Sequence, residues 1–65
     1  MKEQVKTEQD RQAQQQGATH KDAEGVYYQK SVSGVLVARW DDEQGKLGKW
    51  ELSWMYHLPP WVVVL

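Results

Sequence analysis

Hydrophobic and polar residues alternate in the middle of the chain in the manner of β-strands. Three runs there are rich in aromatic and β-branched side chains, which favour a pleated backbone. These runs are residues 26–30, 35–40 and 49–54. Turn-forming clusters that contain glycine separate the runs, at residues 31–34 and 41–48. The pattern therefore predicts a small β fold, a three-stranded antiparallel meander over residues 25–54.

The two flanking segments differ from the middle in composition. Residues 1–24 are rich in glutamine and in charges of both signs, and they carry no apolar stripe that a helix could bury. We predict that they form a disordered polar N-terminal arm. Residues 55–65 are mostly apolar, and Pro59 and Pro60 end any strand or helix that reaches them. This C-terminal tail can fold back on the sheet as a fourth strand at its edge.

Strand alternation also predicts two faces, because side chains two residues apart lie on the same side of a sheet. The predicted apolar face holds Val26, Tyr28, Leu36, Ala38, Trp40, Trp50, Leu52 and Trp54. A single sheet cannot bury its own apolar face, so another element has to cover it. We expect Trp50 and Trp54 to belong to the core, and an exposed aromatic platform for bases or a peptide is the alternative.

Composition limits the chemistry that the chain can perform. The 65 residues contain no cysteine, and His20 and His57 lie far apart, so neither a metal site nor a cofactor is expected. No nucleophile or base stands in a catalytic or phosphate-binding spacing, so we expect the chain not to be an enzyme. The longest apolar run, residues 61–65, is far shorter than the ~20 residues that span a bilayer, so no membrane partner is expected.

Three short motifs carry a resemblance to a known family. They are Gly25-Val26-Tyr27-Tyr28, then Val37-Ala38-Arg39-Trp40, then Gly45-Lys46 before the third strand. This pattern resembles the DNA-binding domain of the Apetala-two/ethylene-responsive-factor (AP2/ERF) family, especially its apicomplexan type. Members of that family pack three antiparallel strands against a C-terminal helix and place the sheet in the DNA major groove. The resemblance implies the sheet part of an α+β domain, truncated before its helix.

The resemblance also implies which residues contact DNA. Arg39 is expected to bind guanine, Tyr27 and Gln29 to contact neighbouring bases, and Lys49 to touch phosphate. The implied function is sequence-specific binding of double-stranded DNA, as part of a transcription regulator in the nucleus. The predicted sheet holds four basic and four acidic side chains, a balance that predicts weak affinity. The alternative is a protein-interaction module, or a non-functional fragment, whose apolar sheet face or edge strand is covered by a protein partner.

Overall fold

The structure, a computed structural model, describes residues 7–65. Within them the elements are α1 (Glu8–Gln15), β1 (His20–Lys21), β2 (Val26–Ser31), β3 (Gly34–Asp41), β4 (Lys46–Leu47), β5 (Glu51–Leu52) and β6 (Val63–Val64). The strand order is β4-β3-β2-β1-β6, and β5 pairs with β3 on the same edge as β4. Every strand pair is antiparallel. The small antiparallel β class expected from the sequence is therefore confirmed, with one short helix added.

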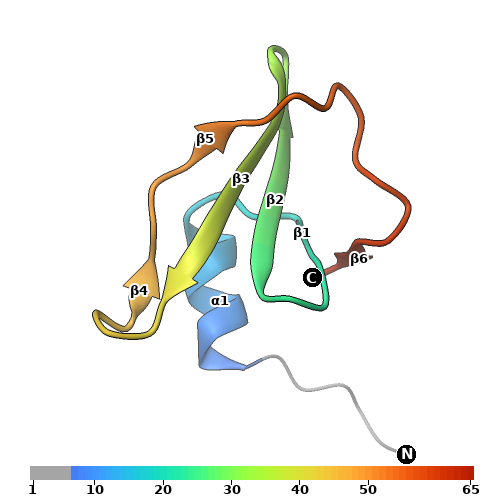
Figure 1. The fold of residues 1–65 in the computed structure, drawn as a ribbon. Helices are drawn as coiled ribbons and strands as arrows, with labels where there is room; N and C mark the ends of the chain where they lie inside the picture. The colour runs from blue at the N-terminus through green and yellow to red at the C-terminus, as the bar shows by residue number, and fades with distance from the viewer. Residues whose placement is uncertain (1–6) are drawn as a thin grey trace, which may run out of the picture.

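The hairpin of β2 and β3 forms the centre of the sheet (Figure 1). Its register runs from Val26 opposite Arg39 to Ser31 opposite Gly34, so a two-residue loop closes the turn. The Ser31 hydroxyl donates to the Gly34 carbonyl (3.0 Å) and accepts from the Ser33 N–H (3.1 Å). Gly34 has a φ of +133°, a conformation that strains any residue with a side chain. The first two predicted strands and the turn between them are confirmed.

The turn between β3 and β4 is held by hydrogen bonds within the loop itself. Asp41 pairs with Lys46 across the turn. The Asp41 carboxylate accepts from the N–H groups of Glu43 (3.0 Å) and Gln44 (3.2 Å). Gly45 takes a φ of +66°, and its N–H donates to the Asp41 carbonyl (2.8 Å). An acidic segment can therefore form this turn because its first carboxylate satisfies the exposed backbone donors.

The predicted third strand, residues 49–54, is instead two short strands, β4 and β5, with an irregular segment between them. Trp40 lies opposite Leu47, and Leu36 lies opposite Leu52. The outer strand thus has one more residue between these pairs than β3 has. Such an insertion is a β-bulge, which bends a strand and shifts its alternation by one position. The bulge keeps both leucines on the same face of the sheet.

Helix α1 has a well-defined signal at each end. The Thr7 hydroxyl caps the N-terminus by accepting from the Asp10 N–H (3.0 Å). Beyond the C-terminus, Gly17 takes a φ of +108°. The Ala18 N–H then donates back to the Ala13 carbonyl (3.0 Å), the long hydrogen bond of a Schellman motif. The chain can therefore leave the helix and turn directly towards β1.

The disordered arm predicted over residues 1–24 is wrong for the residues that form α1 and β1. Both α1 and β1 lie in that range and belong to the fold, whereas residues 1–6 lie outside the described part of the chain. The hydrophobic pattern did not predict this helix, because the segment buries small side chains instead of a stripe of large apolar ones. Ala13 and Ala18 are both buried. Small side chains let a helix approach a sheet closely, but they produce almost no hydrophobic pattern.

The hairpin register corrects the predicted faces. Tyr27 lies opposite Ala38, and Val26 lies opposite Arg39, so the two strands are offset by one residue from the predicted arrangement. We call the side that carries Tyr27 and Ala38 the helix face and the side that carries Val26 and Arg39 the open face. The core on the helix face consists of Ala13, Ala18, Tyr27, Ala38 and Leu47, with Trp40, Trp50 and Leu65 packed against it. Helix α1 is therefore the element that covers the apolar face of the sheet.

The C-terminal part of the chain connects the two edges of the sheet. After β5, residues 53–62, here called the crossing segment, run to the opposite edge, where β6 pairs with β1 (Figure 1). The Leu65 N–H donates to the Thr19 carbonyl (3.0 Å), and the Leu65 side chain packs against the core. The tail therefore does form an edge strand, and its last residue helps to close the core.

Candidate interaction surface

Large hydrophobic side chains are exposed mainly on the crossing segment and β6. In residues 7–65 the exposed large hydrophobic residues are Val32, Leu52, Trp54, Tyr56, Trp61, Val63 and Val64. Trp54 is 83% exposed and Trp61 is 61% exposed. Single exposed aliphatic residues are ordinary, but a cluster that contains two tryptophans is typical of an interaction surface.

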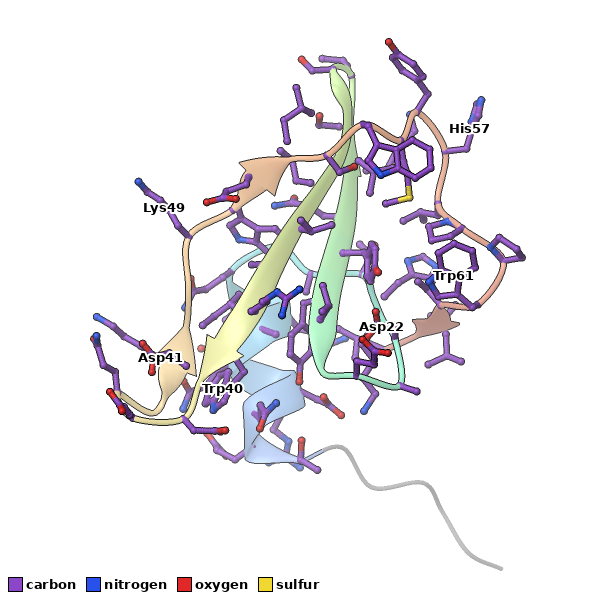
Figure 2. The ribbon with its side chains drawn as sticks, viewed as in Figure 1. Asp22, Trp40, Asp41, Lys49, His57 and Trp61 are labelled. Carbon is purple, nitrogen blue, oxygen red and sulfur yellow. The ribbon has the colours of Figure 1, made fainter. Side chains whose placement is uncertain are left out.

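A hollow of about 630 Å³ lies between the crossing segment and the open face. Its floor consists of two adjacent cross-strand pairs, Val26 with Arg39 and Tyr28 with Val37. The β1–β2 turn forms one rim and the crossing segment forms the other. The rim residues are Asp22, Ala23 and Glu24 on the first side, and Ser53, Trp54, Met55 and Trp61 on the second. Figure 2 shows Asp22 and Trp61 on the same side of β2, in the opening between this strand and the crossing segment.

Asp22 organises the first rim. Its carboxylate accepts hydrogen bonds from the N–H groups of Glu24 (2.8 Å) and Val26 (3.0 Å) and from the Tyr28 hydroxyl (2.9 Å). Burial alone would raise the pKa of Asp22, but these hydrogen bonds and the nearby Arg39 charge outweigh burial and hold the pKa below its ordinary value. Asp22 is therefore ionised at neutral pH, and its oxygens are already occupied.

Tyr28 and Glu24 complete this side of the hollow. Burial, followed by the hydrogen bond to Asp22 and the charges of Asp22 and Glu24, raises the pKa of Tyr28. The Tyr28 hydroxyl thus stays protonated and continues to donate to Asp22. Among the residues described, the exposed Glu24 carboxylate has neither a hydrogen bond nor an ion pair. Glu24 therefore offers an unoccupied negative charge at the rim.

The residues predicted to contact DNA do not form one surface. Tyr27 is only 1% exposed, and its hydroxyl donates to the Asp10 carboxylate beneath α1 (2.7 Å). The prediction for Tyr27 is therefore wrong. Gln29 shares the helix face with Tyr27, and its side chain lies beside Gly17. The predicted set fails as a single surface because the hairpin register puts Tyr27 and Arg39 on opposite sides of the sheet.

Arg39 and Lys49 remain exposed, and they share a second, smaller hollow. This hollow has a volume of about 220 Å³ and lies where β3 meets the bulge between β4 and β5. It is lined by Val37, Ala38, Arg39, Gly48, Lys49 and Glu51. Lys49 points away from the sheet in Figure 2. Two cations and one carboxylate give this small surface a net positive charge.

The hollow on the open face depends on residues that the sequence prediction did not select. Trp54 was expected in the core, yet it lies at the rim, because β5 ends at Leu52 and the bulge interrupts the alternation. Asp22 and Trp61 were not among the predicted site residues. Residues 22–25 carry a recognisable turn signal, an aspartate that is followed three residues later by a glycine. Nothing local in the sequence places Trp61 beside that turn.

Other classes of site receive no support from the geometry. In residues 7–65 no group of three or more histidine, cysteine, aspartate or glutamate side chains is arranged to hold a metal ion. Over the same range no helix is long and apolar enough to cross a membrane. No protein-family model matches the chain, and neither the curated proteins nor the solved structures include a match. The resemblance to the AP2/ERF family stays a prediction.

Proposed function

We propose that the chain is a protein-interaction module that binds an extended segment of a partner protein in the hollow on the open face. The observation that carries this proposal is the exposure of Trp54 and Trp61 along one rim of that hollow. A tryptophan side chain removes a large apolar area from water when a partner covers it, and tryptophan is enriched among residues that dominate binding energies. A partner segment would cover both indoles at once.

The shape of the hollow favours a peptide. Its two rims run beside a floor of four side chains from neighbouring strands, so it is a trough and not an enclosed cavity. The volume of about 630 Å³ lies in the range of ~300–1,000 Å³ that is typical of ligand sites. That space holds a few side chains, which suits an extended segment. Apolar Val26 and Val37 alternate on the floor with polar Tyr28 and charged Arg39.

A selection from a random peptide library displayed on phage tests the proposal. The whole chain should enrich a shared motif, and the double variant Trp54→Ala/Trp61→Ala should lose it. Val32→Ala is the matched control, because Val32 is fully exposed at the β2–β3 turn and lies outside the hollow. Circular dichroism would establish that both variants keep the sheet. Enrichment of the same peptides by the double variant would contradict the proposal.

Double-stranded DNA binding, with a place in transcription regulation in the nucleus, is the second candidate function. The specific observation in its favour is the positive hollow shared by Arg39 and Lys49. An arginine can donate two hydrogen bonds to guanine, and a lysine can neutralise a phosphate. The contact surface is smaller than the sequence predicted, because Tyr27 is buried and Gln29 lies on the helix face.

Binding selection on random DNA duplexes tests this second candidate. If the chain binds DNA here, Arg39→Ala should weaken binding by about 1–3 kcal/mol and relax specificity at one base pair. Lys49→Ala should weaken all sequences about equally and reduce the salt dependence by about one unit. Lys30→Ala, on β2 and outside this hollow, is the control. An unchanged motif after Arg39→Ala would remove Arg39 as the base-reading residue.

A further inference from the structure

We infer that the hollow on the open face recognises a cationic side chain of the bound peptide, a lysine ammonium or an arginine guanidinium, between the indoles of Trp54 and Trp61 and the Glu24 carboxylate. This inference rests on the proposed function, since it names the chemistry of the peptide. Two observations carry it, namely the aromatic lining of the hollow and the balance of its charges.

The aromatic lining suits a cation. Tyr28, Trp54 and Trp61 all contribute to the hollow, and the two tryptophans are exposed. The face of an aromatic ring carries negative electrostatic potential, which is strongest for tryptophan, so it attracts ammonium and guanidinium groups. An aliphatic ligand would also gain from covering the indoles. Whether the hollow prefers a cationic or an aliphatic ligand depends on the charges around the indoles.

The charges favour a positive ligand. Two carboxylates, Asp22 and Glu24, and one guanidinium, Arg39, line the hollow, so its net charge is −1 when all three are ionised. The oxygens of Asp22 are occupied by two backbone N–H groups and the Tyr28 hydroxyl. Asp22 therefore supplies a fixed negative field, and Glu24 is the carboxylate available for direct pairing. A bound cation would satisfy this excess negative charge.

Arg39 provides a further test, because its positive charge on the floor of the hollow repels a bound cation. Removing its charge should tighten the binding of a basic peptide, whereas the same change should weaken binding to DNA. One variant thus gives opposite results for the two kinds of ligand. No change in the fold is needed for either result, since the Arg39 side chain is exposed and makes no hydrogen bond or ion pair within residues 7–65.

Calorimetric titration of the whole chain with short blocked peptides tests this inference. One peptide alternates lysine with alanine, a second carries arginine in place of lysine, and matched controls carry glutamine or glutamate. The lysine and arginine peptides should bind, and the glutamine peptide should bind at least about tenfold more weakly. The glutamate peptide should not bind. Added salt should weaken the binding of the basic peptides, because part of the attraction is between charges.

Variants then locate the cation. Trp61→Ala should weaken binding of the lysine peptide by about tenfold or more, and Glu24→Gln should weaken it by about three- to tenfold. Glu24 is exposed, so its variant should fold normally. Glu43→Gln, in the β3–β4 turn and outside the hollow, should bind as the unmodified chain does. Arg39→Ala should bind more tightly.

The outcomes separate this inference from the function on which it rests. Equal binding of the lysine and glutamine peptides would overturn the cationic specificity and leave the peptide module intact. Equal affinities for Glu24→Gln and Glu43→Gln would also overturn it, because the cation would then not pair with Glu24. A phage library that enriches no motif dependent on Trp54 and Trp61 would overturn the proposed function itself.

Discussion

The Tyr27 hydroxyl donates a 2.7 Å hydrogen bond to the carboxylate of Asp10, and this contact joins β2 to α1. The second oxygen of the same carboxylate accepts from the Lys21 ammonium at 2.9 Å. Asp10 is only 5% exposed, so the bonds lie largely away from water, where hydrogen bonds are electrostatically stronger. A single carboxylate thus connects the helix to two strands of the sheet.

Asp10→Asn should lower the free energy of unfolding by about 1–3 kcal/mol, because the amide keeps the size of the side chain but loses the ion pair and one acceptor. Urea unfolding followed by circular dichroism would measure the change. Asp42→Asn, in the exposed β3–β4 turn, is the matched control and should differ from the unmodified chain by less than about 0.5 kcal/mol. Equal stability of the two variants would show that the Asp10 contacts add nothing to the free energy of unfolding.

Acid should weaken the fold through the same carboxylate. Burial alone would raise the pKa of Asp10, but the hydrogen bonds from Tyr27 and Lys21, with the Lys21 charge, outweigh burial and hold the pKa below its ordinary value of 3.8. The contribution to stability is complete well above 3.8 and is lost as the pH falls through the lower, folded pKa. Thermal midpoints should therefore fall less steeply in acid for Asp10→Asn than for the unmodified chain. Parallel curves would contradict this prediction.

Alkali should weaken the fold through Tyr27. Burial, and then the hydrogen bond to Asp10, raises the pKa of Tyr27 from 10.0 to about 12. The unfolded chain loses this proton first, so the stability is present below pH 10 and is lost as the pH rises towards about 12. Tyr27→Phe should be less stable at neutral pH and should lose less stability in alkali. Tyr56→Phe, on the exposed crossing segment, should follow the unmodified chain.

Two turn glycines should differ in their tolerance of a side chain. Gly45 has a φ of +66°, and the space where a Cβ would lie is open. Gly45→Ala should therefore lower the free energy of unfolding by only about 1–2 kcal/mol, because alanine is strained in a left-handed backbone conformation. Gly34 has a φ of +133°, and a Cβ there would lie 3.1 Å from the Met55 carbonyl oxygen. Gly34→Ala should therefore be clearly more destabilising, by about 2 kcal/mol or more. Urea unfolding of both variants would decide, and the reverse order would contradict the described turn.

The last two residues of the chain should contribute unequally to stability. Leu65 packs against the core, whereas Val64 is exposed. Leu65→Ala should lower the free energy of unfolding by about 1–2 kcal/mol, since most of a half-buried leucine side chain is removed. Val64→Ala, one residue earlier in the same segment, should change it by less than about 0.5 kcal/mol. Equal effects in thermal unfolding would show that the terminal residue does not close the core.

The register of the β2–β3 hairpin is set by a short local turn, but its effect on the two faces became clear only from the geometry of that turn. The turn over residues 31–34 was visible in the sequence, and a two-residue loop between Ser31 and Gly34 sets the register of the whole hairpin. Alternation alone left that register open, and a shift of one residue reverses which side chains share a face. This is why Tyr27 was predicted on a surface that it does not reach. The bulge before β5 had a similar effect on Trp54.

The sequence by itself determined the central hairpin and its turns, because strand alternation and turn chemistry act over a few neighbouring residues. Only the tertiary structure decided that α1 covers one face, that β6 pairs with β1, and that Trp61 meets the turn of Asp22 across the open face. These features arise from contacts between distant segments, such as Asp10 with Tyr27 and Leu65 with Thr19. Small or exposed side chains make such contacts without leaving a periodic signal, so the physical information lies in how the segments pack together.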